Sequence, residues 1–146
     1  KQLADALNAR GVVLHHVNRR QEALADYNRC LALNPRNSAA LNNRAAIRRA
    51  QKQYEAAMDD YTQSIAIAPE QDGTWFNRAN LRVTLGDLSG AIADYTESLR
   101  LQPTASAYNS RGLVYWKLGQ QQEAEKDFAE AQKQTKEKTG WLNFQN

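Results

Sequence analysis

The sequence contains few of the residues that interrupt or cross-link a polypeptide. Its 146 residues include three prolines, seven glycines and a single cysteine, Cys30. One cysteine excludes an internal disulfide framework, and the scarcity of proline and glycine allows regular structure over most of the chain. No apolar run approaches the ~18 residues that a membrane-spanning helix needs. The formal net charge of +3 is too small to indicate a nucleic-acid partner by itself.

The three prolines mark an internal repeat. They end the similar segments LALNP, IAIAP and LRLQP, and Pro35, Pro69 and Pro103 lie 34 residues apart. The similar segments EALADY, AAMDDY and AIADYT precede them, and EAEKDF supplies a fourth copy. A fixed period of this length predicts a stack of small structural repeats that share one continuous core.

Several positions keep one size of side chain in all four copies. A small residue recurs at Gly11, Ala45, Ala79 and Gly112. Alanine recurs at Ala23, Ala57, Ala91 and Ala124, and a large ring at Tyr27, Tyr61, Tyr95 and Phe128. Another small column contains Cys30, Ser64, Ser98 and Ala131. We therefore expect close helix packing, and we expect Cys30 to be a buried packing residue rather than a reactive thiol.

The apolar spacing predicts two helices in every copy, because Leu81 and Leu85 lie four residues apart, as do Ala91, Tyr95 and Leu99. We expect helix pairs at 4–17/20–33, 38–51/54–67, 72–85/88–101 and 105–118/121–135. These pairs give the repeats 4–37, 38–71, 72–104 and 105–137 in a single domain, 1–146.

These columns and the terminal proline resemble the tetratricopeptide repeat family over nearly the whole chain. The resemblance implies an all-α fold, a right-handed superhelix (solenoid) of four helix-turn-helix repeats followed by a C-terminal partial helix or tail. The first-helix aromatic usual in the family is present as Trp75 and Tyr108 but replaced by Leu7 and Leu41 in the other copies. A later aromatic is present as Tyr115, where the other copies have Leu14, Arg48 and Arg82.

An arginine and an aspartate recur together in every copy, 16 residues apart. The pairs are Arg10 with Asp26, Arg44 with Asp60, Arg78 with Asp94, and Arg111 with Asp127. One member of each pair falls on the first predicted helix and the other on the second. We expect structural ion pairs, because a bidentate carboxylate is the least costly partner for a partly buried guanidinium. A row of arginines that binds an acidic ligand is the alternative.

The resemblance implies a concave surface lined by the first helices, where family members commonly bind an extended peptide or a partner helix. Asparagine recurs there although it is a mediocre helix former, and its amide can donate to and accept from a peptide backbone. The arrangement is similar to the asparagine ladder of O-GlcNAc transferase at Asn43 and Asn77, or the amides bond neighbouring helices or water. The predicted peptide-binding groove comprises Asn8, Asn42, Asn43, Arg49, Asn77, Asn80, Asn109 and Trp116.

Charge in this predicted groove favours a neutral or acidic partner. Arg48, Arg49, Arg82 and Lys117 leave the surface mildly basic after the four arginine–aspartate pairs are set aside. The positions comparable with the carboxylate clamp of chaperone-binding family members hold no lysine; they are Asn8, Val12, Asn43, Gly73 and Asn77. The resemblance therefore does not favour binding of an Hsp70 or Hsp90 tail.

The residues contain no pattern that predicts catalysis. We find no nucleophile–base constellation, phosphate-binding loop or metal-ligand cluster, and we expect neither enzyme activity nor a cofactor. His15 and His16 point about 100° apart on a helix, so they would chelate a metal poorly. The leading hypothesis is a protein-interaction scaffold. The alternatives are an RNA-binding or self-associating repeat module and a regulatory segment of a larger enzyme, with the cytoplasm as the default expectation for its location.

The C-terminal segment 138–146 resembles the start of a further first helix. Trp141, Asn143 and Asn146 match Trp75, Asn77 and Asn80. Two alternatives stay open: Trp141, Leu142 and Phe144 cap the stack, or they form an apolar tail through which the molecule self-associates. Open end faces are a second route to self-association. Because Lys1 is not a start methionine, we expect the chain to be part of a longer protein.

Overall fold

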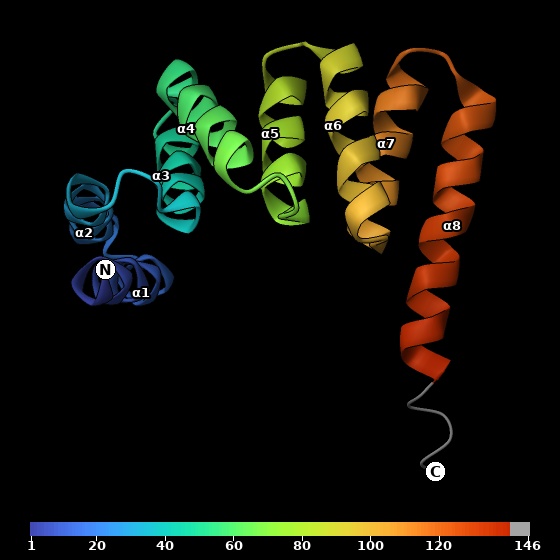
Figure 1. The fold of residues 1–146 in the computed structure, drawn as a ribbon. Helices are drawn as coiled ribbons and strands as arrows, with labels where there is room; N and C mark the ends of the chain where they lie inside the picture. Colours follow the sequence, from blue (N-terminus) through green and yellow to red (C-terminus); the bar gives the residue numbers. More distant parts are fainter. Residues whose placement is uncertain (141–146) are drawn as a thin grey trace. The chain divides into compact units, whose positions relative to one another are not determined.

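The computed structural model describes residues 1–140, and these form eight α-helices joined by short turns (Figure 1). The prediction of an all-α fold built from paired helices is confirmed. The first helices of the four repeats are α1 (Gln2–His16), α3 (Ser38–Ala50), α5 (Asp72–Thr84) and α7 (Ala105–Lys117). The second helices are α2 (Arg20–Leu33), α4 (Tyr54–Ile67), α6 (Leu88–Leu101) and α8 (Gln121–Gly140).

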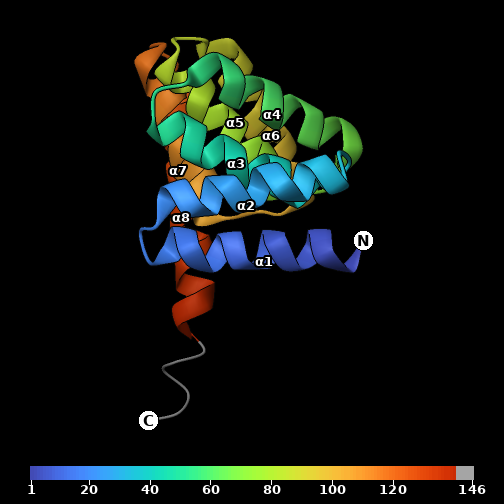
Figure 2. The ribbon, with the colours of Figure 1, turned by 90° about the vertical axis from the view of Figure 1, so that its left-hand side faces the viewer.

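The helices divide into two compact units, Lys1–Glu70 with α1 to α4 and Gln71–Asn146 with α5 to α8. In the first unit, α1 packs beside α2 (Figure 2), α3 packs beside α4, and α3 also contacts α2 and α1. In the second unit, α5 packs beside α6, α7 beside α8, and α6 contacts α7. Each repeat is therefore a helical hairpin, and within each unit the second hairpin packs on the first.

The small residues of the first helices lie directly against the rings of the second helices. A Cβ atom added to Gly11 would lie 2.5 Å from Cε1 of Tyr27, and one added to Gly112 would lie 2.7 Å from Cε1 of Phe128. Real Cβ atoms do not approach a ring this closely, so these two glycines let the helices of one hairpin meet. Cys30 is fully buried in the core of the first unit with Leu7 and Leu41, as its column predicted.

All four hairpin turns use the same backbone geometry. The second residue after each first helix has a positive φ, of 63° at Asn18, 61° at Lys52, 82° at Gly86 and 75° at Gly119. The next amide donates back into the helix, for example from Gln53 N to Arg48 O at 2.8 Å. This left-handed cap with its returning hydrogen bond satisfies helix-end carbonyls. Only two of the four turns have glycine there, so glycine alone does not reveal the motif.

The last helix is longer than the sequence predicted. The helix α8 has 20 residues and runs to Gly140, whereas α2, α4 and α6 have 14 each. Each of those three is followed by a proline within two residues, and α8 is not. Lys138 to Gly140 therefore continue α8. The tail residues Trp141, Leu142 and Phe144, like residues 141–146 as a whole, lie outside the described residues.

Candidate functional site

Each arginine of the repeated column binds its aspartate with two parallel hydrogen bonds. The Nε and Nη2 groups donate to the two carboxylate oxygens, at 2.7 and 2.8 Å for Arg10–Asp26 and 2.9 and 2.8 Å for Arg44–Asp60. The distances are 2.8 and 2.9 Å for Arg78–Asp94, and 2.8 and 2.7 Å for Arg111–Asp127. All four aspartates are buried. The Nε and Nη2 groups of each arginine are thus occupied by the aspartate of the same hairpin.

Two of these arginines, Arg44 and Arg111, also donate a hydrogen bond to the preceding repeat. Nη1 of Arg44 donates to Oδ1 of Asn28 on α2 at 3.0 Å, and Nη1 of Arg111 donates to Oγ1 of Thr96 on α6 at 3.0 Å. One guanidinium therefore joins three helices. Within residues 1–140, Arg10 bonds only to Asp26, and its side chain is 62% exposed against 17% for Arg44. These hydrogen bonds lower the pKa of Asp26 and raise the pKa of Arg10.

A second arginine joins the buried carboxylate in two of the repeats. Nη1 of Arg48 donates to Oδ2 of Asp60 at 2.9 Å, and Nε of Arg82 lies 3.3 Å from Oδ2 of Asp94. Arg82 also lies 3.6 Å from Asp87. Arg48 and Arg82 are therefore held beside buried aspartates rather than standing free in the predicted groove, while Arg44, Arg48 and Asp60 together keep a net positive charge.

The predicted asparagines do not form one continuous row of exposed amides. Nδ2 of Asn43 donates to Oδ1 of Asn8 at 3.1 Å, which links α3 to α1. Oδ1 of Asn80 accepts from the hydroxyl of Tyr95. Asn42 and Asn77 are half-buried and take part in interactions of their own. Of the groove residues proposed from the sequence, Asn109, Trp116 and Arg49 are exposed.

The helix α7 presents an exposed, partly apolar stripe. Asn109, Leu113 and Trp116 follow each other at spacings of four and three residues, which places them on one helix face. Leu113 and Trp116 are each 56% exposed, so the predicted exposure of Trp116 is confirmed. The sequence reasoning missed Leu113, although its position three residues before Trp116 was an available signal. Lys117 extends the stripe with a positive charge.

The opposite side of α7 stacks its arginine between rings. The guanidinium carbon of Arg111 lies 5.9 Å from the centre of the Tyr108 ring and 5.7 Å from that of Tyr115. In the preceding repeat, the guanidinium carbon of Arg78 lies 5.2 Å from the Trp75 ring centre. These cation–π contacts hold each arginine in the orientation that meets its aspartate.

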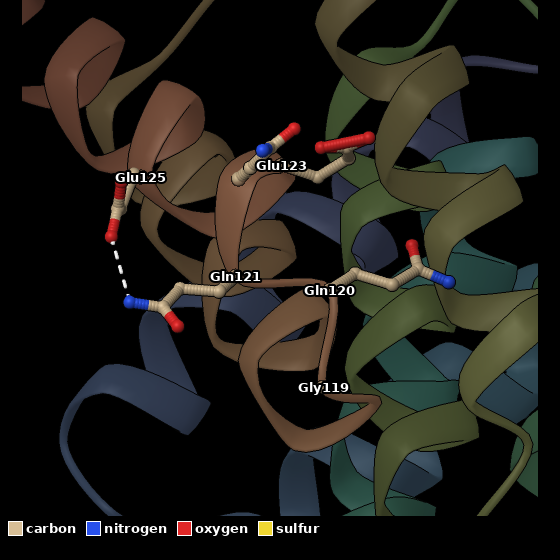
Figure 3. A pocket seen from close by; sticks show the side chains of 6 residues that line it. Gly119, Gln120, Gln121, Glu123 and Glu125 are labelled. Atoms are coloured by element: carbon tan, nitrogen blue, oxygen red, sulfur yellow. Dashed lines mark hydrogen bonds between the residues drawn. The ribbon is translucent and has the colours of Figure 1, made fainter.

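The hollows on the surface are open rather than enclosed. The turn between α7 and α8 borders one of about 550 Å³, where Nε2 of Gln121 donates to Oε1 of Glu125 at 3.0 Å (Figure 3). All residues around it are exposed, so it does not enclose a ligand. Two further hollows, of about 470 and 510 Å³, occupy the same place beside Arg10 and beside Arg111 in their hairpins.

The remaining candidate groups give no chemical site. Burial and the neighbouring Arg20 lower the pKa of His15, and burial raises the pKa of the Cys30 thiol. Among residues 1–140, no three histidine, cysteine, aspartate or glutamate side chains converge on a possible metal position. No helix in this part of the chain has the length and apolarity required to span a membrane.

The comparisons with known proteins agree with this architecture. A crystal structure of MamA superposes with a TM-score of 0.87 at 20% identity and covers 94% of this chain and 81% of its own. The first repeat domain of Spaghetti (RPAP3), bound to the HSP90 peptide SRMEEVD, gives 0.77 at 24% identity over 81% and 94%. A repeat protein from Parabacteroides merdae ATCC 43184 gives 0.78 at 26% identity over 89% and 52%.

Sequence comparison identifies the family directly. No curated protein matches the chain. Two family models, both described as tetratricopeptide repeat, match residues 4–37 and 38–71 in one case and residues 76–137 in the other. Together they span nearly all of the helical hairpins, and the chain belongs to the tetratricopeptide repeat family.

Proposed function

We propose that the chain is a protein-interaction module that binds an extended peptide, neutral to acidic in charge, on the exposed faces of its first helices. Repeat scaffolds of this family typically mediate protein–protein interaction. The observation that carries the proposal is the α7 stripe of Asn109, Leu113 and Trp116. The stripe lies on a helix whose other faces pack against α8 and α6.

The chemistry of the stripe suits a peptide. Trp116 offers a large ring, the side-chain type that most often anchors a binding interface. Leu113 extends the apolar surface by one helical turn, and the Asn109 amide can both donate to and accept from a peptide backbone. Lys117 beside them favours a partner with negative charge. The exposed Arg49 at the end of α3 has the same preference in the first unit.

The related structures support the fold and do not identify a ligand for this chain. The RPAP3 domain is bound to the acidic HSP90 peptide SRMEEVD, but at 24% identity it is evidence for the fold of this chain only. Val12 and Gly73 occupy two of the positions comparable with the carboxylate clamp of chaperone-binding family members. Neither side chain can bind a carboxylate as a lysine does, so we do not propose a chaperone tail as the ligand.

Selection from a displayed library of random peptides tests the proposal. We expect enriched peptides to contain an apolar anchor and acidic residues, and Trp116→Ala or Leu113→Ser to abolish their binding. Leu33→Ser is the matched control, because Leu33 is 57% exposed on the second helix α2. Failure to enrich any peptide, or an equal loss in the control, would contradict the proposal. The double variant Asn43→Ala with Asn77→Ala measures separately what the asparagines contribute.

We further propose that the four arginine–aspartate pairs are structural and do not bind the ligand. The Arg78 side chain is 11% exposed, and two of its donor groups are bound to Asp94. Arg78→Ala should therefore lower the unfolding free energy more than it weakens binding of a selected peptide, measured at a temperature at which the variant is folded. If Arg78→Ala keeps normal stability but loses peptide binding, the arginines instead bind an acidic ligand directly.

A further inference from the structure

The outer face of α1 differs from the same face of the later first helices. Leu3, Ala6, Arg10, Val13 and Val17 form one row along the helix, at alternating spacings of three and four residues. All five are exposed, with 57% for Leu3, 61% for Val13 and 59% for Val17. Such a continuous apolar row with one charge at its centre is not a scatter of single surface residues.

At two positions of this row, Ala6 and Val13, the equivalent residues of other repeats are buried. Ile47 and Val114, which correspond to Val13, are 0% and 2% exposed. Ala40 and Ala107, which correspond to Ala6, are 0% exposed. At these two positions the α1 face is thus the counterpart of a surface that α2 covers on α3 and α6 covers on α7.

The helix that covers this surface in the first unit has a defined pattern. Leu24 of α2 packs in one core cluster with Ile47, and Leu31 packs in another with Ala40. Between them, Oδ1 of Asn28 accepts from Nη1 of Arg44. The second unit repeats the arrangement with Ile92 against Val114 and with Thr96 accepting from Arg111. The covering helix therefore has an apolar residue, a side-chain oxygen four residues later, and a second apolar residue three residues after that.

We propose that the row Leu3, Ala6, Arg10, Val13 and Val17 is a docking surface for a partner helix that carries this pattern and runs antiparallel to α1. Val13 receives the first apolar residue, Nη1 of Arg10 donates to the side-chain oxygen, and Ala6 receives the second apolar residue. Nη1 of Arg10 has no hydrogen-bond partner among residues 1–140. Arg10 is already oriented by Asp26, so the donor is pre-organised for this bond.

A second copy of the chain fits the surface poorly. The last helix α8 has Glu125, Ala129 and Gln132 where α2 has Leu24, Asn28 and Leu31. It therefore offers neither apolar residue and no oxygen for Arg10. Two copies that met through α1 would bring Arg10, the centre of the row, against its own equivalent, which is repulsive. We therefore commit to a helix of the α2 and α6 type as the occupant.

A helical peptide from the chain itself is the probe. A peptide of residues 87–103, stapled between Ser89 and Ala93, presents Ile92, Thr96 and Leu99 and uses two positions exposed in α6. We expect saturable binding of this peptide to the full chain by fluorescence anisotropy. Val13→Glu should weaken it by about tenfold or more, because a carboxylate would be buried in the interface. Leu85→Glu is the matched control, because Leu85 directly follows α5 in the second unit and is 50% exposed, and it should leave the affinity unchanged.

The role of Arg10 is isolated by a double-mutant cycle. Arg10→Lys keeps the charge beside Asp26 but loses the fork, and the peptide change Thr96→Val removes the acceptor without changing its shape. Each change should weaken binding, and the two together should cost little more than one alone. No binding of the unaltered peptide, an unchanged affinity in Val13→Glu, or an equal loss in Leu85→Glu overturns the proposal. A dimer in sedimentation that Val13→Glu dissociates would overturn the proposed occupant in favour of a second copy.

This inference is independent of the proposed peptide binding on α7. The two surfaces belong to different helices in different units, and their test variants, Val13→Glu and Trp116→Ala, do not overlap. Failure of one set of experiments therefore leaves the other unaffected.

Discussion

Arg44 and Asp60 face each other from α3 and α4 through two hydrogen bonds of 2.9 and 2.8 Å, and the Asp60 side chain is 2% exposed. Arg48 adds a third hydrogen bond to the same carboxylate. One buried carboxylate thus binds two arginines. This cluster links α3 to α4 and stabilises the hairpin of the second repeat together with its apolar core.

Asp60→Ala should lower the unfolding free energy by about 3 kcal/mol or more, because it leaves two partly buried guanidinium groups without their carboxylate. Urea unfolding followed by far-UV circular dichroism measures the change. Asp59→Ala is the matched control at an exposed position, and it should alter stability by less than about 0.5 kcal/mol. Equal effects of the two substitutions would show that the cluster contributes no specific stability.

Gly11→Ala should destabilise the first hairpin by about 1–3 kcal/mol, because its Cβ would overlap the buried ring of Tyr27. Gly73→Ala, on α5, meets nothing within 4 Å. It should raise stability by about 0.5–1 kcal/mol, since alanine loses less backbone entropy in a helix. Thermal unfolding of the two variants measures both signs. Stabilisation by Gly11→Ala would mean that the helix pair has room for a larger side chain.

Lys52→Gly should stabilise the chain by about 1 kcal/mol, because residue 52 has a φ of 61°, where a side chain is unfavourable. Gly86→Ala should have the opposite sign, because Gly86 adopts a φ of 82° at the equivalent turn. Both substitutions are at exposed turn positions, so packing changes do not obscure the comparison. Chemical denaturation of both variants provides the test, and a loss of stability in Lys52→Gly would contradict the backbone argument.

Two buried tyrosines should make the fold sensitive to alkali. Burial raises the pKa of Tyr27 and of Tyr61 to about 12, whereas an unfolded tyrosine ionises near about 10. The folded state holds these two protons more tightly. The stability that depends on the neutral phenols is therefore complete below about pH 10 and is lost as the pH rises through about 12.

An ultraviolet titration of phenolate absorbance, read together with far-UV circular dichroism, measures this effect. The phenolate absorbance that appears near about pH 12 should rise together with the loss of helix. The double variant Tyr27→Phe with Tyr61→Phe should lack this part of the absorbance. Full ionisation near the ordinary tyrosine pKa with the helices intact would contradict the prediction.

Much of the fold was predictable from the sequence because the same pattern of small and large residues recurs in each repeat. The small column at Gly11 and Gly112, the rings at Tyr27 and Phe128, and the terminal prolines all specify one hairpin. The end of α8 was predicted five residues short, because no proline follows it and helix-forming residues continue to Gly140. The left-handed turn at Lys52 gave no compositional signal.

The candidate site was less predictable. Trp116 was identified as exposed, but Leu113 was not, and Arg48 and Arg82 were assigned to a basic surface although each lies beside a buried aspartate. A residue type that recurs at one position of the repeat does not show which neighbouring side chain it contacts. A long arginine side chain can reach solvent or turn inward with little change in its local backbone.

The sequence by itself determined the all-α fold, the helical hairpins and the family, because helix periodicity and the packing of small residues against rings are local properties that recur every repeat. Only the tertiary structure decided which charges are compensated and which apolar residues are covered. Val13 and Ile47 occupy the same position of their repeats, yet they are 61% and 0% exposed. The difference depends on whether a preceding helix packs on them, and burial by a neighbouring repeat is a property of the assembled stack rather than of any single residue.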